Sequence, residues 1–204
     1  MNKYGGSFWD ERYSDENYVY GTMPNKFFKE QIDFLKPGRI LMLGEGEGRN
    51  GIYAAQKGWQ VDAVDFSLKA KEKALNHAKD KNVNINYTVE NLENYYPQKN
   101  SYDAAALIFV HLNEKIRIKI HKRVMEALKP GGVIIMEVYS QEQMGRTSGG
   151  PQSPEMLYSI DNIKETFAEL TPLMLSKEIV HLSESSLHSG EASVIRFIGK
   201  KESK

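Results

Sequence analysis

The chain has 204 residues and a formal net charge of zero, with 27 basic and 27 acidic residues. This balance argues against a nucleic-acid-binding protein, which usually carries a basic excess. The absence of cysteine excludes disulfides, thiolate metal sites and a cysteine nucleophile. No apolar run approaches the ~20 residues of a membrane span, and the first residues do not resemble a signal peptide. We therefore expect one cytoplasmic domain, with neither nucleic acid nor a membrane as partner.

The first predicted element is a helix over residues 22–38, with Pro24 near its first position and Pro37 and Gly38 ending it. Short apolar runs that stop at a glycine or an acid then predict strands buried on both faces. These predicted strands lie at residues 39–43, 59–65, 84–89, 102–110 and 133–139. Helical spacing of apolar residues predicts helices at residues 49–58, 68–81 and 114–132. Ser67 and Asn113 precede the last two and are predicted helix caps.

A long connection rich in glycine, serine and glutamine covers residues 140–154, and a helix is predicted near residues 159–170. The chain ends in strand-like segments at residues 173–184 and 192–201, joined without a helix, which predicts an antiparallel pair at a sheet edge. The earlier alternation of strands and helices predicts parallel strands. We therefore predict a three-layer, doubly wound α/β fold of seven strands in the order 3-2-1-4-5-7-6.

Three glycines at alternate positions, Gly44, Gly46 and Gly48, follow the first predicted strand. Ligands of open parallel sheets bind beyond the carboxyl ends of the strands, so these glycines favour close approach of a cofactor to the backbone. A merely tight turn is the alternative. Asp65 ends the second strand 21 residues after Gly44, the spacing of a carboxylate that accepts ribose hydroxyls. Its alternative role is to cap the next helix.

Two glutamates, Glu45 and Glu47, lie between these glycines. At a helix N-terminus they would repel a pyrophosphate, at a cost of ~1 kcal/mol or more. A cofactor with a positive amine and a sulfonium would instead be attracted. The loop therefore favours such a cofactor over a dinucleotide.

At this point the sequence resembles a known family. The motifs "LGEGEGRN", "VDAVDFS", "YDAAALIFVHL" and "LKPGGVIIMEV", in this order, resemble class I S-adenosylmethionine-dependent methyltransferases over roughly residues 8–200. "FWDERY", "GRTSGGP" and "LHSGEASVIRFIGKK" are similar to small bacterial methyltransferases grouped with tellurite-resistance and thiopurine methyltransferases. The resemblance implies a Rossmann-like fold, S-adenosyl-L-methionine as cofactor and one domain over residues 1–204. Within it, residues 1–37 would form a lid and helix, 38–139 the cofactor-binding core, and 140–204 the substrate-side loop and strand pair.

The resemblance also implies positions for the cofactor. The glycine loop would contact its methionyl part, Asp65 its ribose, and Phe66 its adenine ring. The full predicted cofactor-binding set is Trp9, Gly44, Glu45, Gly46, Gly48, Asn50, Asp65, Phe66, Ser67, Asn91, Leu92, Glu93, Phe109 and Val110. One position departs from the family, because Met42 stands where an acid usually precedes the loop. Glu45 is the candidate substitute.

Four residues on loops that would overhang the strand ends are candidate catalytic residues. His111 is either a base or a residue that hydrogen-bonds the following turn. Arg146 either holds an anionic acceptor or lies in solvent, and Tyr139 either orients a substrate or packs under the loop. His188, between the last two strands, either faces the site or does not.

The acceptor class is narrowed by what is missing. Without cysteine, cytosine C5 methylation lacks its nucleophile, and "IFVHLN" lacks the motif of amino-adenine methylation. No acidic cluster suggests a metal site, so none is predicted. A small acceptor remains: a thiol, selenol or metalloid oxyanion, or a small amine or hydroxyl compound, bound by a monomer or homodimer. The competing hypotheses are a nicotinamide-dependent oxidoreductase and a non-catalytic sensor of S-adenosylmethionine or S-adenosylhomocysteine.

Overall fold

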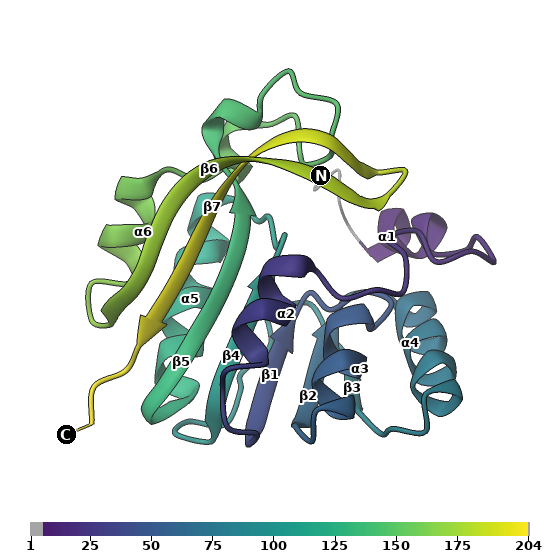
Figure 1. The fold of residues 1–204 in the computed structure, drawn as a ribbon, viewed down its shortest axis with the longest axis horizontal. Helices are drawn as coiled ribbons and strands as arrows, with labels where there is room; N and C mark the ends of the chain where they lie inside the picture. The colour runs from purple at the N-terminus through teal and green to yellow at the C-terminus, as the bar shows by residue number, and fades with distance from the viewer. Residues whose placement is uncertain (1–5, 204) are drawn as a thin grey trace.

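The computed structural model describes residues 6–203, and its centre is one seven-stranded sheet (Figure 1). The order is β3-β2-β1-β4-β5-β7-β6, which confirms the predicted order. Neighbouring strands from β3 to β5 are parallel, whereas β7 is antiparallel to both β5 and β6. The strands are β1 (Arg39–Leu43), β2 (Gln60–Asp65), β3 (Asn86–Val89), β4 (Tyr102–Ile108), β5 (Leu128–Tyr139), β6 (Thr171–Ser185) and β7 (His188–Lys200).

Six α-helices occur in the described part of the chain. They are α1 (Gly6–Arg12), α2 (Lys26–Ile32), α3 (Arg49–Gln56), α4 (Leu68–Asp80), α5 (Glu114–Ala127) and α6 (Ile160–Thr166). Ser67 and Asn113 cap α4 and α5, as predicted, each accepting a hydrogen bond from a backbone N–H of the first turn. The predicted position of Pro24 was wrong, because Asn25 caps α2 and Pro24 precedes the cap.

Two further differences concern element boundaries. Helix α1 had no apolar periodicity to reveal it, and it packs beside α4 rather than in the core. β5 begins at Leu128 rather than at Val133, because the chain enters the strand directly from α5 and pairs with Tyr102 before its register shifts. Two short 3-10 helices, Gln141–Gln143 and Pro154–Met156, lie within and at the end of the long predicted connection.

Helices cover both faces of the sheet, and β1 shows why. Ile40 and Met42 point into a core with α2, α3 and α4, whereas Leu41 and Leu43 point into a second core with α5 and α6. A strand that is buried on both faces requires the continuous apolar run found in the sequence. The predicted three-layer arrangement is therefore present.

The β6–β7 hairpin is longer than the rest of the sheet, and its turn end curves toward the N-terminal segment (Figure 1). His188, at this end, contacts the rings of Tyr20 and Phe109. The hairpin thereby brings His188 beside Phe109, at the carboxyl end of β4. Within residues 6–203, no helix is both long enough and apolar enough to cross a membrane.

Candidate functional site

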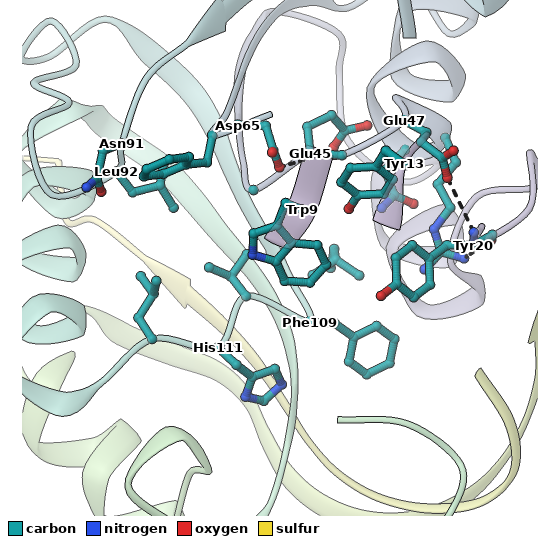
Figure 2. A pocket seen from close by; sticks show the side chains of 18 of the residues that line it. Trp9, Tyr13, Tyr20, Glu45, Glu47, Asp65, Asn91, Leu92, Phe109 and His111 are labelled. Carbon is teal, nitrogen blue, oxygen red and sulfur yellow. Dashed lines mark hydrogen bonds between the residues drawn. The ribbon is translucent and has the colours of Figure 1, made fainter. Parts of the chain in front are cut away.

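A cavity of about 200 Å³ opens at the carboxyl ends of β1, β2 and β4, where the strand order reverses. We call it the carboxyl-end cavity. In Figure 2, Trp9 lies between Asp65 and Glu45 on one side and Phe109 and His111 on the other. Its lining includes these predicted residues: Trp9, Gly44, Glu45, Gly46, Asn50, Asp65, Phe66, Asn91, Leu92, Glu93, Phe109, Val110, His111 and His188. Four predicted residues do not line it: Gly48, Ser67, Tyr139 and Arg146.

The glycine loop after β1 keeps the backbone open to this cavity. Gly44 and Gly46 both have a φ of 59°, a left-handed conformation that side chains disfavour. A Cβ on Gly46 would lie 2.8 Å from the Tyr13 hydroxyl, and one on Gly44 would lie 3.0 Å from Val110. The loop is held in place because the Tyr87 hydroxyl donates to the Gly46 carbonyl at 2.6 Å. A side chain at either glycine would fill the space beside the loop.

Asp65 is a buried acid at the end of β2 that lines the cavity. Its two oxygens accept hydrogen bonds from the backbone N–H groups of Gly46, at 2.9 Å, and Ser67, at 3.0 Å. Burial raises the pKa of Asp65, and these backbone donors oppose the rise. Ser67 itself caps α4 and bonds Asp10, which explains why it does not reach the cavity. The neighbouring Phe66 is 39% exposed, so its ring is available at the cavity wall.

The two loop glutamates have structural partners. Glu45 accepts from the Gly51 N–H at 2.6 Å and so satisfies the first turn of α3, and burial raises its pKa to about 7. Glu47 accepts from the Val19 N–H at 2.8 Å and pairs with Lys73. The two glutamates therefore have a structural role that the argument from cofactor charge did not predict. They attach α3 and the N-terminal segment to the loop that follows β1. Gly48, with a φ of 89°, is the residue before α3.

The segment after β3 forms another wall. Asn91 accepts from the Glu93 N–H at 2.9 Å and thereby closes a local turn, and Leu92 is buried. Arg123 of α5 donates to the carbonyl oxygens of Glu93, at 2.7 Å, and Tyr95, at 3.1 Å. This long-range clamp, which no sequence motif indicated, fixes the wall to the helix behind it.

Phe109 marks the opposite wall, at the end of β4. Its φ is 55°, unusual for a bulky residue and costing about 1–3 kcal/mol. The conformation is held by a 2.7 Å hydrogen bond from its N–H to the Glu137 carbonyl. Its ring stacks on Tyr139, with centroids 4.6 Å apart, and meets His188 edge-on at 4.7 Å. Strain of this kind is typical of functional sites.

His111 has little freedom to act as a base. Its Nδ1 lies 2.9 Å from the Met156 carbonyl oxygen, which only accepts, so Nδ1 carries the proton. Its Nε2 accepts from the Tyr139 N–H at 3.3 Å. Burial lowers the pKa of His111 to about 4. Both ring nitrogens therefore bond the main chain, in keeping with its structural alternative.

His188 differs, because only one ring nitrogen is engaged. Its Nδ1 lies 3.3 Å from Glu184, which also receives Arg49 at 2.8 Å. Its Nε2 has no hydrogen-bond partner among residues 6–203 and is not sealed from solvent. The His188 residue is 7% exposed and lines the cavity. Burial lowers the pKa of His188, so the ring is neutral at pH 7.

Tyr139 and Arg146 lie outside the cavity. The Tyr139 hydroxyl donates to the Ser148 carbonyl at 3.2 Å, so this side chain packs under the long connection. The Arg146 side chain bonds the Glu142 carbonyl at 3.3 Å. Neither has a place in the function proposed below.

Residues of the N-terminal segment, among them Trp9, Tyr13 and Tyr20, line the cavity. Trp9 and Tyr13 stack with centroids 5.7 Å apart, and Arg12 donates to the Tyr20 hydroxyl at 3.1 Å. Arg49 and Tyr20, also in the lining, were absent from the predicted binding set. The sequence offered one indication for Tyr20, because it is an aromatic residue next to a glycine. Arg49 could not be predicted, because its side chain is positioned by Glu184, which is distant in sequence.

Comparisons with known proteins identify a matching domain and a shared fold. Residues 40–132 match the family model of the methyltransferase domain. Comparison with curated proteins finds no match to this sequence. Solved structures share this fold at low sequence identity, and such a likeness shows a common fold only.

Three structures illustrate the likeness. A protein from work on conversion of a disulfide bond into a thioacetal group during echinomycin biosynthesis is 15% identical, covering 97% of this chain and 92% of its own, with a TM-score of 0.75. TehB from Haemophilus influenzae is 17% identical, covering 97% and 67%, with a TM-score of 0.74. An S-adenosylmethionine-dependent methyltransferase from Methanosarcina mazei is 17% identical, covering 84% and 96%, with a TM-score of 0.69. The chain therefore has the fold of class I methyltransferases, and its segment 40–132 matches their methyltransferase domain.

Proposed function

We propose that this protein is an S-adenosylmethionine-dependent methyltransferase that acts on a small molecule. One observation carries the proposal: a single cavity joins the open glycine loop and Asp65 to an aromatic wall with an accessible histidine nitrogen. The first half suits a nucleoside cofactor, and the second half suits an acceptor. The methyltransferase domain match supports this assignment over a nicotinamide-dependent oxidoreductase.

The residues present fit the cofactor. Gly44 and Gly46 line the cavity without side chains, which favours close approach of a ligand to the backbone. The Asp65 carboxylate can accept two ribose hydroxyls, and the exposed ring of Phe66 offers an apolar face to adenine. When bound, S-adenosylmethionine supplies a methyl group on a cationic sulfur whose departure leaves a neutral thioether.

The reaction needs mainly alignment and the exclusion of water. The lid aromatics Trp9, Tyr13 and Tyr20 provide the exclusion, because they cover the cavity from the N-terminal side. The residues above would hold the cofactor, which would supply its methyl group to a lone pair of the acceptor and be left as a neutral thioether. For a protic acceptor, His188 Nε2 receives the released proton, and Glu184 keeps the opposite ring nitrogen oriented.

The acceptor we propose carries a soft nucleophilic atom, sulfur, selenium or tellurium, as in the tellurite-resistance and thiopurine group that the sequence resembles. The wall facing it is formed by Phe109, Tyr20 and neutral histidines. Arg49, the cation that lines the cavity within the described residues, is already paired with Glu184. An uncharged acceptor is therefore favoured over an oxyanion such as tellurite.

The first test is binding, by thermal shift with S-adenosylhomocysteine and with NAD and NADP. Stabilisation by S-adenosylhomocysteine alone is expected, and stabilisation by NAD or NADP alone would overturn the assignment. The second test is turnover, measured by mass spectrometry of methylated products from a panel of thiols, selenols, amines, selenite and tellurite. Binding without any product would favour the non-catalytic sensor.

The role of His188 is tested by His188→Gln, with His181→Gln as control, because His181 is an exposed histidine of β6. We expect kcat to fall about 100-fold or more in the first variant and to stay unchanged in the second. In the parent protein the rate should fall as the pH drops below the lowered pKa of His188, since protonation removes the lone pair. A His188→Gln enzyme with the parent rate and the same acidic limb would exclude the base.

A further inference from the structure

A buried polar network adjoins the carboxyl-end cavity, and its central residue, Asn25, is not part of the cavity lining. We call it the Asn25 network, because Asn25 joins its parts. Asn25 is 1% exposed and comes just before α2. Its backbone N–H donates to Asn50 Oδ1 at 2.8 Å, and its side-chain oxygen accepts from the Phe28 N–H at 2.8 Å. The first bond reaches a cavity residue, and the second caps the helix.

The remaining polar atom of Asn25 joins two buried ion pairs. Its Nδ2 donates to Glu137 at 2.7 Å and to Glu184 at 2.9 Å. Arg196 pairs with Glu137 at 2.6 Å, and Arg49 pairs with Glu184 at 2.8 Å. One amide group thus uses both its hydrogens on carboxylates from β5 and β6. A side chain needed only as a helix cap would not require these donors.

The arrangement orients carboxylates that would otherwise repel each other. Glu137 is 1% exposed, and its pKa is raised by burial and by the charge of Glu184. The pKa of Glu184 is lowered to about 2 although burial opposes this, because His188 and Arg49 favour the charged form. The Asn25 amide donates to the facing oxygens of both groups, so it separates two anions while satisfying each.

We propose that Asn25 is a positioning residue for the reaction. Its side-chain amide fixes the Glu184 carboxylate, which in turn fixes the tautomer and orientation of His188. Through its backbone N–H it holds Asn50, so the two halves of the cavity share one anchor. This inference rests on the proposed function for its effect on rate, but its effect on His188 is measurable without turnover.

A substitution separates the two side-chain roles of Asn25. Serine is as good a helix cap as asparagine, so Asn25→Ser can still accept from Phe28, and its backbone N–H can still bond Asn50. It loses both amide donors to Glu137 and Glu184. Asn113→Ser is the matched control, because Asn113 caps α5 in the same way through Ile116. Its described side-chain contacts include no carboxylate.

The decisive measurement is the titration of His188 by nitrogen-15 NMR with S-adenosylhomocysteine present. The groups around this ring are Glu184 on β6, Arg49 on α3, Arg12 on α1, Tyr20, His111 and Tyr139. Glu184 raises the pKa of His188, whereas Arg49 and Arg12 lower it. If Glu184 is released, we expect the pKa of His188 to fall further and the Nδ1–H tautomer to lose its dominance.

The expected kinetic result for Asn25→Ser is a kcat lowered about 10-fold or more, with the dissociation constant of S-adenosylhomocysteine within about three-fold of the parent. Asn113→Ser should leave both unchanged. An unaltered His188 titration in Asn25→Ser would overturn the inference, whatever the rate. An altered titration together with a fully active His188→Gln would keep the positioning role and refute the base instead.

Discussion

Asp65→Asn separates the charge of Asp65 from its shape, and its effect can be worked out from the contacts of the carboxylate. The asparagine oxygen can still accept from Gly46 or from Ser67, which now donate at 2.9 and 3.0 Å. One of these backbone groups then faces an amide donor, and we expect a moderate loss of stability. Alanine would leave both groups unpaired and could unfold the loop.

The loss in cofactor affinity follows from the two proposed ribose hydrogen bonds. A bond to a charged group contributes about 1.5–3 kcal/mol, and a bond between neutral groups about 0.5–1.5 kcal/mol. Losing the charge from two bonds therefore costs about 2–3 kcal/mol, or about 30- to 140-fold in the dissociation constant. This magnitude is well above the error of calorimetry.

The assay is isothermal titration calorimetry with S-adenosylhomocysteine, alongside thermal unfolding of each variant. Asp62→Asn is the control, because Asp62 lies on the same strand and is similarly buried, but pairs with Arg39 and Asn86 outside the cavity. We expect it to alter stability without altering affinity. A ten-fold change in the dissociation constant corresponds to about 1.4 kcal/mol. If the dissociation constants of Asp65→Asn and Asp62→Asn for S-adenosylhomocysteine differ by less than about three-fold, the ribose assignment is refuted.

Gly46→Ala should lower both the melting temperature and the affinity for S-adenosylhomocysteine, because the left-handed backbone costs about 1–2 kcal/mol and the new Cβ meets the Tyr13 hydroxyl; calorimetry showing unchanged affinity would contradict the close approach. Arg123→Met should raise KM for the cofactor about ten-fold with little change in kcat, since it releases the Glu93 wall; an unchanged KM would contradict this. Burial lowers the pKa of His121 from 6.5 to about 3 in the folded protein. As the pH drops below 6.5, this histidine is protonated in the unfolded chain but not in the folded one, so the free energy of unfolding decreases. His121→Phe should remove that loss, by up to about 1.4 kcal/mol per pH unit in urea unfolding, and an identical pH dependence would count against it.

The fold was predictable because the residues of each central strand are themselves enough to identify it as a strand. The run from Ile40 to Leu43 is apolar at every position. A strand needs such a run only when both of its faces are buried, as they are here. Glycines and an acid at the strand ends then marked the side on which a ligand would bind. The terminal pair was recognisable because no helix separates its strands. Helix α1 escaped prediction because its packing partner, α4, lies more than 50 residues away.

The site was predictable where residues follow a strand directly, as Asp65 and Phe109 do, because the strand end fixes their place. It was not predictable where a side chain depends on partners brought together by the hairpin. Tyr139 also ends a strand, but its ring lies on the side facing the long connection. A position at the end of a strand places a residue at the edge of the sheet where the cavity lies. Because side chains alternate between the two faces of a strand, the face decides whether that residue lines the cavity.

The two cavity histidines show most clearly why residue type and spacing do not settle chemistry. From sequence, His111 is the better candidate base, because it directly follows the predicted strand at residues 102–110. In the folded chain its two nitrogens bond main-chain groups of Met156 and Tyr139, and no lone pair remains for a substrate. His188 follows a turn near the end of the chain, yet it lines the cavity, and Glu184 binds one of its nitrogens while the other has no hydrogen-bond partner among residues 6–203. Since a base needs one nitrogen held and one free, His188 rather than His111 is the residue that we propose as the base.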